Sequence, residues 1–530
     1  MKKQFFNNSI KLGALAIFVV ISSCTKDLDR TPFVEVTSAT VYKDFSNYKQ
    51  ILAKVYAGLA VSGQQGPAGR PDISGIDEGF STYLRQYWKA QQLPTDEAVI
   101  GWNDGSLPDY HDMDWTSGNE FITAMYNRIF YQITLCNEFI RETSDAKLGD
   151  RGISAENQTT ARVFRAEARF LRALSYYHAL DMFGNVPFVT EADAVGSFLP
   201  RQATRTELFS YVESELKAIE TELLDARKNE YGRADKGAAW ALLAKLYLNA
   251  EVYIGAPKYT ECITYCNKIT GAGYALESDY NKLFLTDNNK SAEMIFPITF
   301  DGTRTKTWGG MTFLVHAGVG GNMNPADFGI NGGWSGLRTT KALVQKFSDI
   351  TGATDRRAMF HTNGQKLDIS DIFTFNDGYA ITKYRNVSST GVKGTDTEGN
   401  FPDTDFPLFR LADVYLTYAE AVLRGGQGGS QATALQYVNA LRTRAYKGNT
   451  GDVTSINLDF ILDERARELY WEAHRRTDLI RFKKFTGSLY VWPWKGGTKD
   501  GRAVADHLVI FPIPASDLVA NPNLDQNSGF

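Results

Sequence analysis

The feature that most constrains the fold of this chain is a set of long segments in which apolar residues recur at spacings of three and four. Such spacing places apolar side chains on one face of an α-helix, and that face has to pack against another element. The segments are residues 162–180, 207–223, 237–254, 409–425, 432–446 and 462–482. The sequence therefore predicts a mostly α-helical protein.

A shorter unit, Leu-Ala-x-x-Tyr, recurs along the chain at residues 52–56, 243–247 and 411–415. Trp240 precedes the second copy by three residues, which gives the pattern of the first helix of a tetratricopeptide unit with Ala in place of Gly. The small residue lets two antiparallel helices approach closely, and the tyrosine packs across the pair. Because the copies are not in tandem, we expect a tetratricopeptide-like scaffold of helix pairs that is interrupted by insertions.

The expected insertions are rich in Gly, Pro, Asp and Trp and cover residues 61–80, 95–118 and 301–338. Long loops in compact proteins are usually functional, so we expect a loop-rich, partly β half with insertions near 61–118 and 301–400 that carries a ligand site. The stretch around Trp308, residues 303–313, shows neither the spacing of a helix nor the alternation of a strand, and it is predicted to be a loop. A β-rich patch is expected at 359–386, with an Asn-Gly hairpin turn followed by a strand.

The N-terminus has the order of a secretory signal peptide. Residues 1–11 are polar and basic, residues 12–21 are apolar but too few to span a bilayer, and Ile21, Ser22 and Ser23 lead to Cys24. This resembles the lipobox of bacterial lipoproteins and implies that residues 1–23 are removed and that Cys24 is lipidated. The mature chain would then be tethered to a membrane. Ordinary cleavage beside an incidental cysteine is the alternative.

Charge and metal-binding residue types limit the other functions. The formal net charge is −4, and loss of the three lysines of the signal segment takes it to −7, so a nucleic-acid partner is not expected. Cys262 and Cys266 are spaced to share one helical face, yet no histidine or further cysteine stands near them in sequence. We interpret both as small buried helix residues. We expect no catalytic metal or cofactor.

Several longer motifs resemble the SusD/RagB family of glycan-binding outer-membrane lipoproteins over essentially the whole mature chain, residues 24–530, which would form one domain. They are residues 167–189, 234–250, 406–421, 464–482 and 511–527. The resemblance implies a tetratricopeptide-like helical half, an irregular half that carries the glycan site, and a SusC-like TonB-dependent transporter as partner. It also implies a position on the cell surface, and the acidic residues 25–29 resemble tags that send lipoproteins there.

Shorter stretches are similar to starch-binding members of that family, namely residues 63–79, 93–102, 307–315, 331–337 and 491–497. This similarity implies that Trp102, Trp308 and Trp334 form an arc of rings for starch or malto-oligosaccharides. Indole faces stack on the apolar C–H faces of hexose rings, and three rings on a curve would select a curved α-1,4-glucan. Arg85, with Asn103 or Asp104, would supply polar contacts. The remaining tryptophans are interpreted as packing residues: Trp88, Trp115, Trp240, Trp471, Trp492 and Trp494.

The same similarity implies a structural calcium ion held by Asp403 and Asp405, with Asp287 as a further ligand. Alternating carboxylates on a loop can bind calcium through oxygen, although such residues equally often cap helices.

Three other functions remain open beside α-glucan capture. These are a SusD-like protein for another polysaccharide, a helical-repeat lipoprotein that recruits proteins, and a surface glycoside hydrolase. A hydrolase would need two carboxylates facing each other across the aromatic groove. The acidic residues near the predicted groove are Asp104, Asp112, Asp114 and Asp301. Since no other catalytic signature accompanies them, we expect a binding protein and no enzyme.

Overall fold

The structure is a computed structural model that describes residues 38–67, 69–196 and 198–530. The expected signal peptide and Cys24 lie outside these residues. The chain divides into two units, Met1–Tyr48 and Lys49–Phe530, and the second contains the helical scaffold and its loops. The prediction of a single domain over residues 24–530 stays a prediction.

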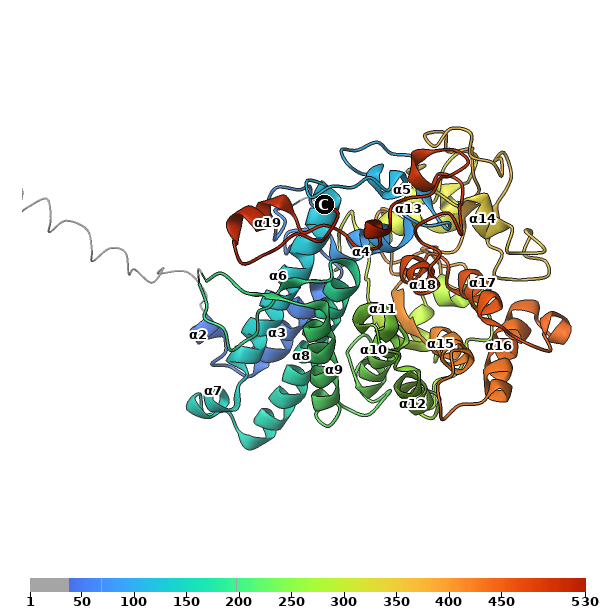
Figure 1. The fold of residues 1–530 in the computed structure, drawn as a ribbon. Helices are drawn as coiled ribbons and strands as arrows, with labels where there is room; N and C mark the ends of the chain where they lie inside the picture. Colours follow the sequence, from blue (N-terminus) through green and yellow to red (C-terminus); the bar gives the residue numbers. More distant parts are fainter. Residues whose placement is uncertain (1–37, 68, 197) are drawn as a thin grey trace, which may run out of the picture. The chain divides into compact units, whose positions relative to one another are not determined.

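The described chain is mostly helical, as the apolar spacing predicts (Figure 1). The α-helices are α2 (Ser38–Val41), α3 (Ser46–Ala57), α4 (Tyr83–Gln92), α5 (Asp109–Asp112), α6 (Glu120–Glu142), α7 (Asp145–Asp150), α8 (Ala155–Met182), α9 (Arg205–Ile219), α10 (Lys236–Leu248), α11 (Ala250–Ile254), α12 (Tyr259–Thr270), α13 (Gly310–Ala317), α14 (Lys341–Val344), α15 (Leu411–Leu423), α16 (Gln431–Tyr446), α17 (Leu458–Leu469), α18 (Arg475–Arg481) and α19 (Ala515–Ala520). Short 3₁₀ helices lie between them: η1 (Tyr280–Phe284), η2 (Asn288–Lys290), η3 (Pro325–Phe328), η4 (Asn449–Gly451), η5 (Lys495–Gly497) and η6 (Asp506–Val509). No helix in the described ranges combines the length and apolar character needed to cross a bilayer.

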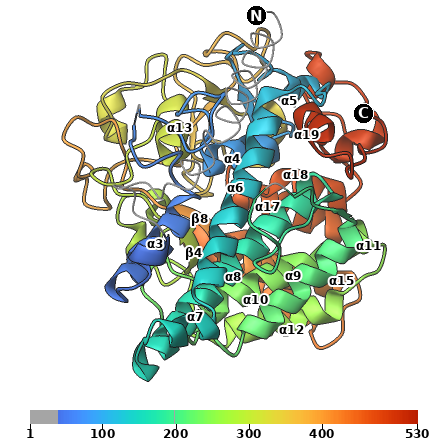
Figure 2. The same cartoon turned by 90° about the vertical axis from the view of Figure 1, so that its left-hand side faces the viewer.

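The long helices pack in a series that matches the expected helix-pair scaffold. Helix α6 packs on α8, α8 on α9, α9 on α10, α10 on α12, α12 on α15, and α15 on α16. Figure 1 shows the whole series, and Figure 2 shows its members from α6 to α15 from a second direction. The alanines of the second and third Leu-Ala-x-x-Tyr units, Ala244 and Ala412, are buried in α10 and α15. The tyrosines reach neighbouring helices: Tyr247 donates to Glu213 of α9 at 2.7 Å, and the Tyr415 ring stacks on Tyr437 of α16 at 4.1 Å.

The strands form short antiparallel pairs, β1 with β5, β2 with β3, β4 with β8 and β6 with β7. They are β1 (Val99–Ile100), β2 (Val186–Pro187), β3 (Gln202–Ala203), β4 (Met294–Ile298), β5 (Leu337–Arg338), β6 (Phe360–His361), β7 (Ala380–Ile381) and β8 (Phe406–Arg410). Both strands of the longest pair, β4 and β8, are buried throughout.

The predicted β-rich patch at 359–386 is reduced to one antiparallel pair of two-residue strands, and its turn is not the one predicted. Phe360 pairs with Ile381 and His361 with Ala380. The Asn-Gly dipeptide makes a local turn, with Gly364 at φ 72°, but it does not join the two strands. The intervening segment is instead organised by Asp377, whose carboxylate accepts the backbone N–H groups of Ser370 and Asp371, each at 3.0 Å. A buried carboxylate therefore replaces the hairpin.

The prediction that residues 303–313 are entirely loop is wrong at its C-terminal end, because α13 begins at Gly310. All eight residues of α13 are buried, so the helix has no solvent-exposed face and its sequence lacks the alternation of apolar and polar faces that marks a surface helix. The Thr82 hydroxyl accepts the Gly310 N–H at 3.1 Å. A side chain at Gly310 would meet the Phe300 ring at 2.6 Å, and its φ of 52° also favours glycine. Tight packing therefore fixes a helix start that the Gly-Gly pair conceals.

The segment 462–482, predicted as one helix, is broken into α17 and α18. Trp471 and Ala473 both have φ of 62°, outside the helical region. Side chains from elsewhere take the carbonyl groups at the break, because Trp88 Nε1 and the Tyr384 hydroxyl each donate to the Trp471 carbonyl at 2.9 Å. These tertiary bonds satisfy groups that a continuous helix would have used itself.

Candidate functional site

Five of the six predicted contact residues line one open cavity of about 410 Å³. Its lining consists of Asp77, Gly79, Phe80, Arg85, Trp102, Asp104, Trp308 and Trp334. Asn103 is exposed beside the cavity but does not belong to its lining. The structure thus brings together residues from α4 and from four separate loops.

The three tryptophan rings form a row with Trp334 in the middle. The centroid of the Trp334 ring lies 6.4 Å from that of Trp102 and 6.4 Å from that of Trp308. The planes of the outer rings are inclined to Trp334 by 45° and 52°. A ligand that contacts all three rings therefore meets surfaces that turn along its length.

Backbone pairing sets Trp102 beside Trp334. Strands β1 and β5 are antiparallel, and the Gly101 N–H, directly after β1, donates to the carbonyl of Gly336, directly before β5, at 2.9 Å. A side chain at Gly336 would lie 2.5 Å from the Trp102 ring. Glycine at this position therefore lets the ring lie flat against the neighbouring backbone.

Trp308 is held by contacts with Arg85 of α4 and with Phe401. Arg85 donates through Nη1 to the Gly79 carbonyl at 3.0 Å and, more weakly, to the Trp308 carbonyl at 3.4 Å. The Phe401 ring packs behind the indole at 4.9 Å. Trp102, Trp308 and Trp334 are all half-buried.

Arg85 is the main cation of the cavity. Its side chain is buried, with the guanidinium 4.3 Å from the Phe313 ring centroid and 4.8 Å from that of Phe80. Burial lowers the pKa of Arg85 to about 9, opposed by the carboxylates of Asp77 and Asp104, so the group still carries its charge at neutral pH. Its Nε is buried and has no hydrogen-bond partner among the described residues.

Sequence reasoning missed Asp77 and Phe80 in the lining and, behind the rings, Phe401 and His316. The His316 ring stacks on the Trp334 ring at 4.8 Å with planes 26° apart. No local pattern distinguishes such residues from ordinary loop and core residues, because their role depends on contacts with distant segments.

The three predicted calcium ligands do not gather into a cluster. Asp287 accepts the N–H and hydroxyl of Ser389, and Asp403 accepts the Gly302 N–H. Asp405 is buried and bonded to the Tyr231 hydroxyl at 2.7 Å. The described residues contain no group of three or more His, Cys, Asp or Glu side chains arranged to hold a metal. The positions of these carboxylates do not fit a calcium ion. The calcium site stays a prediction that their geometry does not support.

Other sequence interpretations concern residues outside the cavity. Cys262 and Cys266 are buried in α12, as predicted. Of the acidic residues named for a hydrolase, Asp104 lines the cavity and Asp112, Asp114 and Asp301 do not. The six remaining tryptophans lie outside the lining. Four of them are buried, namely Trp88, Trp115, Trp471 and Trp492, while Trp240 and Trp494 are half-buried.

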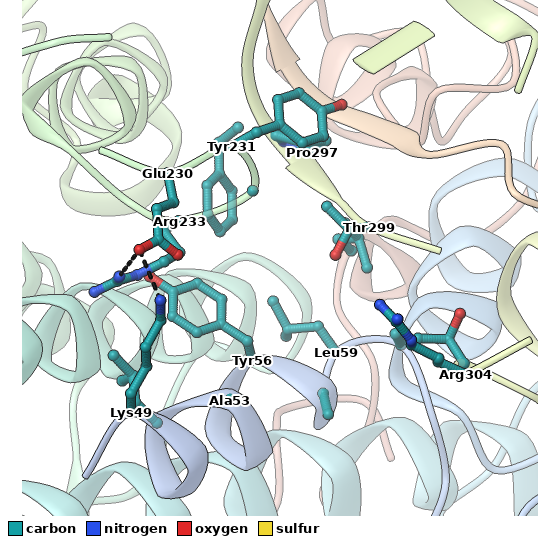
Figure 3. A pocket seen from close by; sticks show the side chains of 17 residues that line it. Lys49, Ala53, Tyr56, Leu59, Glu230, Tyr231, Arg233, Pro297, Thr299 and Arg304 are labelled. Carbon is teal, nitrogen blue, oxygen red and sulfur yellow. Dashed lines mark hydrogen bonds and ion pairs between the residues drawn. The ribbon is translucent and has the colours of Figure 1, made fainter. Parts of the chain in front are cut away.

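A larger cavity of about 550 Å³ lies between α3, residues 230–233 and β4 (Figure 3). Its charged side chains already have partners, because Lys49 pairs with Glu230 at 2.7 Å and Arg233 pairs with Glu167 at 2.5 Å. None of the predicted contact residues lines it. Size alone therefore does not identify the site; the row of indoles beside Arg85 and Asp104 does.

Comparison with known proteins identifies the family. A model described as the SusD family matches residues 367–530, and one described as starch-binding and associating with the outer membrane matches residues 32–248. The chain is 35% identical to the starch-binding protein SusD of Bacteroides thetaiotaomicron, with 100% of each chain covered. The chain belongs to the SusD family. SusD-like protein P25 of Formosa agariphila is a more distant relative, 27% identical with 96% of each chain covered.

Solved structures confirm the SusD fold. A SusD-like carbohydrate-binding protein of Bacteroides fragilis superposes with a TM-score of 0.70 at 21% identity, covering 92% of this chain and 100% of the other. Surface glycan-binding protein A of Bacteroides fluxus gives a TM-score of 0.69 at 19% identity, covering 92% and 99%. The helix-pair scaffold with its loop-rich half is thus the architecture of the SusD family, a family described as associating with the outer membrane.

Proposed function

We propose that this SusD-family protein captures starch and malto-oligosaccharides, that is α-1,4-glucan, at the cavity lined by Trp102, Trp334 and Trp308. The observation that carries the proposal is the row of three mutually inclined indoles, 6.4 Å apart on each side of Trp334. Each indole offers a face for the C–H groups of one side of a sugar ring. Arg85 and Asp104 stand at the edge of the same row to bond sugar hydroxyls.

The inclination of the rings favours a curved glycan over a straight one. An α-1,4-glucan turns along its length, so successive sugar faces can follow planes inclined by 45° and 52°. A β-1,4-glucan is extended, so a sugar that stacks on one indole would place the next sugar out of contact with the neighbouring, inclined indole. The name of the 35% identical relative, a starch-binding protein, agrees with this choice.

The same proposal includes a position and a partner. Lipidation at Cys24 would hold the protein on the outer membrane facing outward, and a SusC-like TonB-dependent transporter would receive the glycan. Support comes from the order of residues 1–24 and from the family description as associating with the outer membrane. The protein would act by binding, without cleaving its ligand.

Calorimetry with maltoheptaose, with cellohexaose as the straight-chain control, tests the ligand. We expect saturable binding of maltoheptaose and none of cellohexaose at the same concentrations. Equal binding of both, or binding of neither, would contradict the α-glucan assignment. Chromatography of the glycan after incubation tests the absence of cleavage, and shorter products from purified protein would favour the hydrolase.

A further inference from the structure

His316, on the last turn of α13, contacts two loops of the site at once. Its Nδ1 lies 2.7 Å from the Gly332 carbonyl oxygen and its Nε2 lies 2.9 Å from the Asn400 carbonyl oxygen. The side chain is 1% exposed, so water does not compete for either nitrogen. One imidazole therefore bridges the loop of residues 331–336 and the loop of residues 396–401.

These two loops carry or support two of the three rings of the arc. The first contains Trp334. Its indole stacks on the His316 ring, and its backbone N–H donates to the His316 backbone carbonyl at 2.8 Å. The second contains Phe401, which packs behind Trp308 at 4.9 Å. The imidazole thus stands where it can fix the position of Trp334 relative to Trp308.

The number of hydrogen bonds that His316 can donate to these two carbonyl groups depends on its charge state. A carbonyl oxygen only accepts, so each nitrogen has to carry a hydrogen to bond it. Neutral imidazole has one N–H and serves one carbonyl, while its other nitrogen turns a lone pair toward the second oxygen. The imidazolium has two N–H groups and serves both.

We propose that His316 is a positioning residue that fastens the two loops, and that its protonation tightens the arc and strengthens glycan binding. The ligand in this inference rests on the proposed function, whereas the clamp itself belongs to the free protein. By linkage, if the glycan binds the fastened arc more strongly, bound glycan raises the proton affinity of His316, and affinity rises as pH falls.

The surroundings set the direction of the titration. Burial lowers the pKa of His316 below its ordinary value, and the Gly332 and Asn400 carbonyl groups oppose this shift. Helix α13 itself carries no other titratable side chain. The charged residues on the segments packed around it are Asp396 and Glu398 on the second loop, Asp403 just after that loop, and Arg85 and Lys89 on α4. Asp396 accepts the N–H groups of Asn400 and Phe401, at 2.8 and 2.9 Å, and so holds the second loop in place.

The first test compares maltoheptaose affinity between about pH 5 and 8 for the parent, His316→Phe and His361→Gln. Phenylalanine keeps a ring against Trp334 but bonds neither carbonyl. We expect the parent to bind about threefold more tightly at the acid end, and His316→Phe to bind about threefold to tenfold more weakly with no such trend. His361 lies on β6 outside the cavity lining, and its variant should keep the parent profile. A parent-like affinity and profile in His316→Phe would overturn the proposal.

A second measurement needs no substitution at His316 and starts from the free protein. Fluorine NMR of protein that contains 5-fluorotryptophan, with the Trp334 signal assigned from Trp334→Phe, should show that signal moving with pH between about 4 and 8. Maltoheptaose should raise the midpoint. A signal that does not move with pH, or a midpoint that bound maltoheptaose leaves unchanged, would overturn the clamp. If the parent binds no α-glucan yet the signal moves, the clamp stands and only the proposed ligand fails.

Discussion

Trp334 is the residue on which the geometry of the site converges. It is the only one of the three indoles that neighbours both others, and His316 supports it from another side. Trp334→Ala should therefore weaken maltoheptaose binding more than Trp102→Ala or Trp308→Ala. A central aromatic anchor typically contributes about 2 kcal/mol or more, and each 1.4 kcal/mol is about a tenfold change in Kd. Calorimetry on the three variants gives the ranking.

The matched control for these variants is Trp240→Ala. Trp240 is also half-buried, and its Nε1 donates to Glu220 at 2.9 Å, but it lies in α10 outside the cavity lining. Its loss should leave affinity unchanged. An affinity that stays at the parent value in all three cavity variants would remove the arc. Because Trp308 packs on Phe401, Trp308→Ala should also cost about 1 kcal/mol of stability, so melting temperature has to be measured beside affinity.

Asp405 predicts a pH dependence of stability. Burial, opposed by the Phe300 N–H and the Tyr231 hydroxyl, raises the pKa of Asp405 to about 7. A carboxyl whose pKa is higher in the folded state favours folding when protonated, so this contribution is lost as pH rises from about 4 to 7. The free energy of unfolding of Asp405→Asn, taken relative to that of the parent, should therefore be higher at pH 8 than at pH 5. Urea unfolding at both pH values measures the difference.

The same residue tests the calcium prediction. Calcium bound to the Asp405 carboxylate would need its ionised form and would reverse the sign of this trend. We expect the melting temperature to be the same with calcium and with a chelator. A higher melting temperature in calcium, lost in Asp405→Asn, would instead restore the ion that the geometry does not support.

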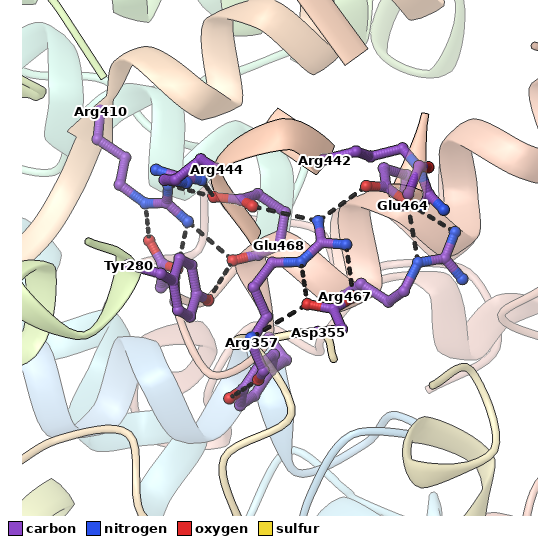
Figure 4. Close-up of polar contacts among 12 residues, drawn as sticks. Tyr280, Asp355, Arg357, Arg410, Arg442, Arg444, Glu464, Arg467 and Glu468 are labelled. Carbon is purple, nitrogen blue, oxygen red and sulfur yellow. Dashed lines mark hydrogen bonds and ion pairs between the residues drawn. The ribbon is translucent and has the colours of Figure 1, made fainter. Parts of the chain in front are cut away.

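At the scale of elements, a buried ion network joins β8, α16 and α17 (Figure 4). Arg357 and Arg410 pair with Glu468 at 3.3 and 2.7 Å, and Arg444 pairs with the same carboxylate. Burial alone would raise the pKa of Glu468, but Arg444, Arg410 and Arg357 outweigh it and hold it at about 2. The network thus links β8, α16 and α17 through the shared carboxylate of Glu468.

Glu468→Gln should lower the free energy of unfolding by about 3 to 5 kcal/mol at pH 7, because it leaves buried guanidinium groups without their shared counter-charge. Since the pKa of Glu468 is lowered in the folded state, its contribution is present above the unfolded value and is lost as pH falls toward about 2. The gap between parent and variant should therefore narrow in acid, which urea unfolding at pH 7 and pH 4 would reveal.

The comparison variant is Asp368→Asn, which breaks the exposed Lys341–Asp368 pair of 2.6 Å. Exposed pairs contribute about 0 to 1 kcal/mol. If Glu468→Gln costs no more than Asp368→Asn, the network does not have the role assigned to it.

For the whole molecule, the first question is attachment to the membrane. The basic, apolar and small-residue segments end at Cys24, and no described helix could replace a lipid anchor by spanning the bilayer. Cys24→Ala should release the protein into the soluble fraction, as measured by membrane fractionation and immunoblotting. A variant that still sediments with the outer membrane would exclude Cys24 as the anchor.

The second question is the transporter. Detergent extraction and affinity purification from cells grown on starch should recover an outer-membrane β-barrel protein with this chain. Cells grown on glucose provide the reference for induced expression. Repeated recovery of the lipoprotein alone, from membranes in which the barrel protein is present, would count against the proposed partnership.

The sequence by itself determined the helical class, the helix pairs and the residues of the aromatic row. Helical periodicity is a local property, so segments such as 162–180 and 432–446 fall within α8 and α16. The family motifs named Trp102, Trp308 and Trp334 because their neighbours in sequence match those of starch-binding relatives.

Only the tertiary structure decided where those residues meet and what holds them. Trp102 lies beside Trp334 because β1 pairs with β5, and the helix of residues 462–482 breaks because Trp88 and Tyr384 take the Trp471 carbonyl. The bridging position of His316 has the same origin. The physical reason is common to all three: each depends on hydrogen bonds and ring contacts between residues far apart in the chain, and no local pattern records them.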